Sequence, residues 1–109
     1  SIQEDVQAAS KITDSQSWVI YPIILDSRIE LFVIPPSGKE IHKVIPNVKR
    51  EELTATVQTF MDAIRDPSNN DYLEASQKLY NWIIRPLDGD LKSAKVKTLI
   101  FVMDGPLRA

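Results

Sequence analysis

The sequence predicts an α/β protein, with α+β as the alternative class, and three observations lead to this prediction. Apolar residues alternate with a period of two up to about residue 45, and the period then changes to about 3.6. An unbroken apolar run, Leu99–Met103, follows near the end of the chain. The predicted order is a short helix, three strands, two helices and a final strand, which suits helices packed against a mixed sheet. The 109 residues fit one domain spanning 1–109.

Residues 1–11 begin the chain with an amphipathic pattern. Ile2, Val6 and Ala9 are spaced by four and three residues, which predicts one short helix with its charged residues turned outward. A polar break at 13–16 separates this helix from the first strand.

Three strands follow and are joined by short turns. They span Trp18–Leu25, Ile29–Ile34 and Lys39–Ile45, with polar or proline-rich turns between them, so we expect an antiparallel meander. Pro22 interrupts the first strand. Because proline has no N–H to donate to a ladder, we expect this strand to lie at a sheet edge or to bulge at Pro22.

Two amphipathic helices come next. Apolar residues at helical spacing predict the first over Lys49–Arg65, with Asn47 as its N-cap. A second apolar face predicts a helix over Asp71–Arg85. Its first residue and Glu74 have the spacing of a capping box, and Pro86 should end or kink the helix near its last residues.

The last strand, Thr98–Met103, is the element on which the predicted architecture depends. A continuous apolar run rich in β-branched and aromatic residues predicts a strand buried on both faces, inside a sheet with helices on each side. A turn signal, Asp104-Gly105-Pro106, follows it directly. In such folds ligands bind beyond the carboxyl ends of the strands.

The composition excludes several kinds of protein. Thirteen basic and fifteen acidic residues give a net charge of −2, which is too balanced for a surface that binds nucleic acid or an anionic membrane. The absence of Cys excludes disulfides, thiolate metal sites and a Cys nucleophile, and the single His excludes a His-rich metal site. No apolar run reaches the roughly 18 residues of a membrane span, and the acidic N-terminus differs from a signal peptide, so a cytoplasmic location is expected.

Two segments are distinctive beyond their periodicity. One is a helix carrying Leu79-Tyr80 and then Ile84-Arg85-Pro86-Leu87, and the other is a strand ending in Asp104-Gly105-Pro106-Leu107. Together they resemble the first part of a CHAT domain, a caspase-like family of cysteine peptidase and peptidase-like domains often found downstream of tetratricopeptide repeats.

Earlier segments extend this resemblance. The family has a Tyr-containing strand, a second strand and a helix beginning with Arg-Glu-Glu-Leu, and these correspond to Tyr21, Ile29–Ile34 and Arg50–Leu53. The resemblance thus covers residues 2–109 and implies a partial caspase-like fold. One departure is Met103, which stands where the family usually has Pro before Asp-Gly.

The resemblance also implies where catalysis would lie. The family's catalytic His and Cys each follow a later strand, downstream of the Asp-Gly-Pro-Leu corner, and neither has a counterpart here. No catalytic, cofactor-binding or metal-binding residue is therefore expected in this chain, which as given should not be an enzyme. We expect a non-catalytic N-terminal segment that scaffolds the catalytic half of a parent cysteine peptidase, with the remainder of that polypeptide or another protein as its partner.

A free-standing interaction or self-association module is the alternative from a different class. A sheet that stops after one buried strand leaves an apolar edge or face, and such a surface favours a protein partner or a second copy of the chain. A third interpretation is a small-molecule sensor that uses a cleft between the meander and the helices, although no residue pattern names a ligand or cofactor.

Few individual residues suggest chemistry. His42 lies in mid-strand with no nucleophile signature around it, which indicates a side chain at the rim of the sheet rather than a catalytic base. Asp104 is interpreted as a turn carboxylate that bonds nearby backbone N–H groups. Asp88, Asp90 and Asp104 lack the spacing of a calcium-binding loop, so no metal site is predicted.

Overall fold

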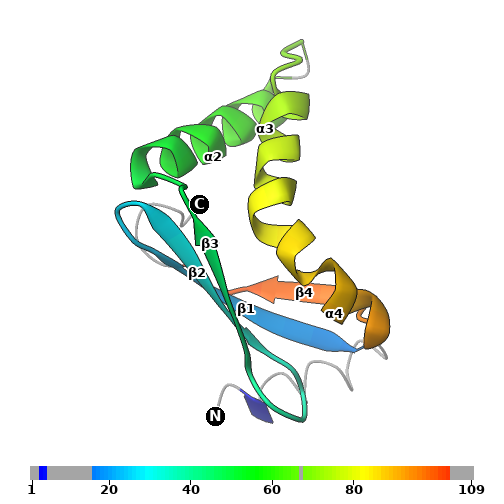
Figure 1. Ribbon diagram of the computed structural model, residues 1–109. Helices are drawn as coiled ribbons and strands as arrows, with labels where there is room; N and C mark the ends of the chain where they lie inside the picture. Colours follow the sequence, from blue (N-terminus) through cyan, green and yellow to red (C-terminus); the bar gives the residue numbers. More distant parts are fainter. Residues whose placement is uncertain (1–2, 5–15, 67, 104–109) are drawn as a thin grey trace.

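The computed structural model describes residues 3–4, 16–66 and 68–103. They form a four-stranded sheet in the order β3-β2-β1-β4, and the helices lie on one side of it (Figure 1). The mixed α/β architecture predicted from the sequence is confirmed. The turn predicted at 104–106 lies outside the described residues, and so does the helix predicted at 1–11 apart from the helical pair Gln3 and Glu4.

The predicted meander is present as strands β1 (Ser17–Ile24), β2 (Arg28–Ile34) and β3 (Ile41–Pro46). β1 pairs antiparallel with β2, and β2 pairs antiparallel with β3. Alternation along β2 places Ile29, Leu31 and Val33 on the face that the helices cover, where each is 0% exposed. The opposite face of the same strand is half-buried.

Helix α2 (Arg50–Arg65) begins one residue after the predicted start, but its predicted N-cap is wrong. Lys49 occupies the N-cap position and makes no side-chain capping bond, while Asn47 lies two residues earlier with φ 60°. Asn47 tolerates this left-handed conformation and turns the chain out of β3. Instead of a cap, the Arg50 amide donates to the Asp26 carbonyl oxygen at 3.1 Å, which ties the helix to the β1–β2 turn.

The second predicted helix is broken near its end, as Pro86 predicts. Regular helix α3 (Tyr72–Leu79) gives way to a π-helical turn, η1 (Tyr80–Ile84), and a 3-10 turn, η2 (Arg85–Leu87), before the short helix α4 (Asp88–Ser93). Pro86 cannot donate to a carbonyl one turn earlier, and its ring crowds that carbonyl, so the preceding turn widens.

The start of α3 departs from the predicted capping box. Asp71 occupies the N-cap position but makes no side-chain capping bond, so the predicted pairing with Glu74 is wrong. The Asn69 side chain accepts a hydrogen bond from the Asp71 amide at 2.8 Å instead. The Asn69 side chain, in an Asx turn just before the helix, therefore accepts the Asp71 amide hydrogen bond that the capping box assigned to Glu74.

The core lies between the sheet and the helices. Leu53 of α2 and Leu87 of η2 are fully buried against the strands, and Ile83 of η1 is nearly so. The cluster also contains Trp18, Ile20, Ile29, Leu31, Val33, Ile45 and Val48. The apolar faces of the helices thus cover the apolar face of the sheet, and each excludes water from the other.

Strand β4 (Thr98–Phe101) joins the sheet parallel to β1, as a mixed sheet requires. Its predicted burial on both faces is wrong, because β4 is the terminal strand of the described sheet and its residues are half-buried or exposed. Phe101 and Val102 are each 37% exposed. The apolar run therefore forms an edge strand whose apolar side chains are only partly buried.

The expected edge position of the first strand is also wrong, since β1 lies between β2 and β4, and its register with β2 runs through Pro22 without the bulge given as the alternative. The Val102 amide donates to the Ile20 carbonyl, so the backbone groups of Ile20 point toward β4. Pro22, two residues on, points its nitrogen the same way, just past the last β1–β4 pair, Ile20 and Phe101. The proline thus spares the β1–β2 ladder and ends the β1–β4 ladder.

No helix in the described part of the chain is long and apolar enough to cross a membrane.

Candidate functional site

His42 lies on β3 with its side chain on the sheet face away from the helices, at the rim as predicted. Its Nε2 is 2.7 Å from Oε1 of Glu30, and Nε of Arg28 is 2.9 Å from Oε2 of the same carboxylate. The imidazole also stacks on Phe32, with ring centroids 4.4 Å apart and planes 7° apart. These contacts satisfy both carboxylate oxygens of Glu30.

This cluster lowers the pKa of Glu30. The hydrogen bond with His42 is the largest cause and the one from Arg28 is the next, because both favour the charged carboxylate. The Arg28 and His42 side chains are 49% and 47% exposed, so water and salt screen the cluster. Its geometry is that of a surface ion-pair network across two strands, not of a base poised against a nucleophile.

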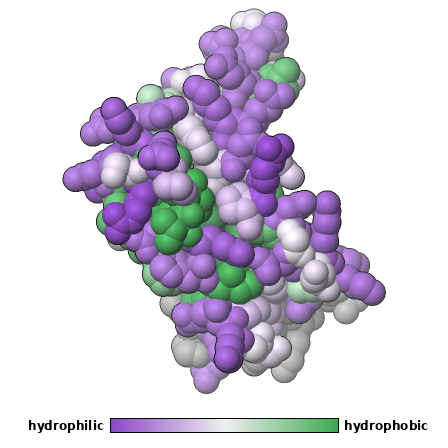
Figure 2. Space-filling view, in the orientation of Figure 1, coloured by the Kyte–Doolittle hydropathy of each residue, from purple (hydrophilic) through white to green (hydrophobic). Residues whose placement is uncertain are grey.

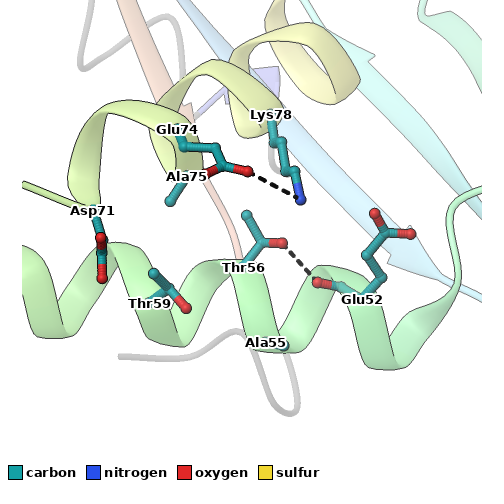
Figure 3. A pocket seen from close by; sticks show the side chains of 8 residues that line it. All are labelled: Glu52, Ala55, Thr56, Thr59, Asp71, Glu74, Ala75 and Lys78. Carbon is teal, nitrogen blue, oxygen red and sulfur yellow. Dashed lines mark hydrogen bonds and ion pairs between the residues drawn. The ribbon is translucent and has the colours of Figure 1, made fainter.

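A groove lies between α2 and α3 (Figure 3). Thr56 Oγ1 donates to the Glu52 carbonyl oxygen at 2.8 Å, and Lys78 Nζ lies 3.9 Å from Glu74 Oε1. The remaining lining residues are Ala55, Thr59, Asp71 and Ala75. No group of acidic or His residues able to hold a metal ion occurs among the described residues.

This groove is not the cleft considered from the sequence. The space between the meander and the helices is filled by core side chains, among them Leu31, Leu53 and Leu87 at 0% exposure. A small-molecule cleft there is therefore ruled out by close packing. The groove between the helices is instead open, and charged side chains as well as Thr and Ala line it.

The aspartates weighed as cation ligands lie apart in ion pairs. Asp88 pairs with Lys92 at 3.0 Å along α4, and Asp90 pairs with Lys43 of β3 at 3.4 Å. Asp104 lies outside the described residues. Asp88 and Asp90 are therefore surface ion-pair residues, each with a lysine partner.

The two edges of the sheet differ in how they are protected. The β3 edge carries His42 and Lys43 and ends at Pro46, and charges and proline are common devices against edge-to-edge pairing. β4 has none of these devices from Thr98 to Met103. In the described part of the chain, the one unprotected edge of the sheet is β4.

The sheet face away from the helices also has exposed apolar residues. Ile23 is 43% exposed and Val44 is 51% exposed, and Val102 lies on this face near the β4 edge. Figure 2 shows apolar patches among hydrophilic side chains below α2, over the region of the strands. Single exposed apolar side chains are common on protein surfaces, so this face by itself does not indicate a partner.

Comparison with models of known protein families, with curated proteins and with solved structures found no match. The site is therefore described by its geometry: an open parallel edge strand and a partly apolar sheet face on a mixed α/β fold. The sequence indicated an apolar surface in need of a partner but placed the last strand inside the sheet. The short strand length and the position of Pro22 were the available signals for an edge.

Proposed function

We propose that this chain is a non-catalytic N-terminal segment of a CHAT-like, caspase-like domain and scaffolds a catalytic half outside the 109 residues given. The observation that carries the proposal is β4, which pairs parallel with β1 after a helical crossover and has no described strand on its outer side. A parallel edge of this kind accepts a further strand of the same sheet. The Leu-Tyr helix, the kink at Pro86 and the apolar strand lie in the order that the resemblance implies.

Within this proposal the chain has no hydrolytic activity of its own. Cysteine peptidase chemistry requires a thiolate activated by a neighbouring His, and this sequence has no Cys. We expect the purified chain to leave fluorogenic peptides uncleaved at any pH at which it is folded. Reproducible cleavage that His42→Ala abolishes would contradict the proposal, and Val44→Ala on the same strand is the matched control.

The family assignment has a direct test in the gene. We expect the reading frame beyond the codon for Ala109 to encode a His and then a Cys, each following an apolar strand pattern. A stop codon at that point would contradict the scaffold proposal. The proposal places the protein in the cytoplasm, with the rest of its own polypeptide or another protein as partner, and with neither nucleic acid nor membrane.

A second candidate function is self-association, and the difference between the two sheet edges favours it. β3 carries Lys43 and Pro46, whereas β4 is uncharged and has exposed apolar side chains. Light scattering across a concentration series tests this function. A strictly monomeric chain at the highest concentration would contradict it.

A further inference from the structure

We propose that two copies of this chain pair through β4, antiparallel and centred on Phe101, so that one sheet runs through both copies. This inference rests on the second candidate function, self-association, and names the surface and the register. It follows from the backbone geometry of the edge and from the side chains along it.

One side of the β4 backbone pairs with no other described strand. The amides of Thr98 and Val102 donate to the Gln16 and Ile20 carbonyls of the β1 side. Because successive residues of a strand point their backbone groups to opposite sides, the N–H and C=O groups of the odd-numbered residues point away from β1. Leu99 and Phe101 lie in β4, and Met103 continues this series directly after Val102, whose amide still bonds β1.

This series of outward-pointing residues is complementary to itself. In an antiparallel pair, hydrogen-bonded residues exchange both of their bonds with the residue directly opposite. Placing Phe101 opposite Phe101 of the second copy puts Leu99 opposite Met103 and Met103 opposite Leu99. All three outward residues then make both bonds, as a two-fold symmetric interface requires. A register shifted by two residues loses one of these positions, so the centred register makes the most bonds.

The side chains match in the same register. Phe101 meets Phe101 of the second copy, and aromatic cross-strand pairs stabilise a sheet. On the other face, Ile100 lies opposite Val102, which is 37% exposed in the single copy. No residue from Thr98 to Met103 is charged, so the pairing places no like charges opposite each other. A charged peptide strand would not have this match, which favours a second copy as the occupant.

The same reasoning excludes the opposite edge. Antiparallel pairing of β3 with itself would bring Lys43 side chains of two copies close together, and Pro46 has no N–H to donate. Because the contact is one short strand, we expect a dimer that dissociates on dilution.

The first experiment measures the molar mass of the full chain by sedimentation equilibrium over a wide concentration range. We expect a monomer–dimer equilibrium whose dissociation constant rises at least about tenfold in Phe101→Lys, because two ammonium groups then face each other. Ile64→Lys adds the same charge at a position of α2 that is 58% exposed and lies outside the sheet, so it should leave the equilibrium unchanged. Circular dichroism confirms that both variants are folded.

A second experiment does not depend on a destabilising charge. The chain has no Cys, so Phe101→Cys introduces a single thiol. Hydrogen-bonded antiparallel partners have Cα atoms about 5.5 Å apart, within the range of a disulfide. In a glutathione redox buffer we expect Phe101→Cys to form a covalent dimer at least about tenfold more than Ile64→Cys, which places the thiol on exposed α2.

The outcomes separate the two levels of the proposal. A monomer at every concentration overturns both self-association and the β4 pairing. A dimer that Phe101→Lys leaves intact, or that forms no excess disulfide with Phe101→Cys, overturns the β4 register alone and leaves self-association through another surface. Weakening by Phe101→Lys together with the excess disulfide supports the centred register.

Discussion

The amide nitrogen of Val102 donates a 3.0 Å hydrogen bond to the carbonyl oxygen of Ile20, and this bond joins the end of β4 to β1. The next position of β1 that points its backbone toward β4 is Pro22, which has no N–H. A proline in an interior strand therefore limits the length of its parallel neighbour without disturbing its antiparallel neighbour. Pro22 therefore sets the point at which the β1–β4 ladder ends.

Pro22→Val should lengthen the β1–β4 ladder. The new amide at position 22 faces the Val102 carbonyl, so we expect hydrogen exchange at that amide to be slowed at least about tenfold relative to an unprotected amide. A net gain of about 1 kcal/mol from the hydrogen bond is opposed by about 0.4–1 kcal/mol from the freer unfolded chain, so global stability should change little. Pro46→Val, at the β3 edge, is the control and should leave exchange in β4 unchanged. A fast-exchanging amide at position 22 would show that the ladder ends for another reason.

Leu31→Ala should destabilise the protein strongly. Leu31 is 0% exposed at the centre of the sheet, and truncating a buried leucine costs about 2–5 kcal/mol because a cavity remains. Urea unfolding followed by circular dichroism measures the loss. Leu73→Ala removes the same atoms from a side chain that is 56% exposed and should change stability by less than about 0.5 kcal/mol. Equal losses in the two variants would contradict the assignment of the core.

Lys95→Gly should stabilise the end of α4. The Val96 amide donates to the Leu91 carbonyl and the Lys95 amide to the Lys92 carbonyl, which is the bonding of a Schellman motif. Lys95 has φ 53°, a conformation that costs a side-chain-bearing residue about 1 kcal/mol or more, and glycine adopts it without that cost.

Thermal unfolding tests this expectation. We expect Lys95→Gly to raise the free energy of unfolding by about 1 kcal/mol. Ser93→Gly, inside the helix, should lower it by a similar amount, about 0.5–1 kcal/mol. A loss of stability in Lys95→Gly would mean that the Lys95 side chain contributes more than its backbone conformation costs.

Glu30→Gln should alter how stability depends on pH. The folded state lowers the pKa of Glu30 below its ordinary value of 4.5, so the ionised carboxylate stabilises the fold above that pH. This contribution is lost as the pH falls through the lowered pKa. We therefore expect Glu30→Gln to be less stable than the wild type at pH 6, with a difference that shrinks as the pH falls below 4.5.

The measurement for Glu30 is the unfolding midpoint in urea at several pH values between about 3 and 6. Glu40→Gln makes the same substitution at an exposed position before β3 and is the matched control. A difference between Glu30→Gln and the wild type that is constant over the whole range would indicate that packing, not ionisation, causes it.

The sequence by itself determined the local structure, because local structure follows from periodicity and from residues with restricted backbones. Alternation fixed the meander, the 3.6-residue period fixed α2 and α3, and Pro86 fixed where the second helix is distorted. The placement of His42 on a strand followed in the same way. Each of these features depends on residues close together in the chain.

The tertiary structure decided which strands lie inside the sheet. The apolar run near the C-terminus has the same pattern whether it is central or at an edge, and only its pairing with β1 makes β4 an edge strand. Pro22 likewise limits a ladder to one side of β1, and nothing in its neighbours shows which side. The hydrogen bond from the Arg50 amide to the Asp26 carbonyl also joins segments far apart in sequence. Strand order depends on such long-range pairing, which a local pattern does not contain.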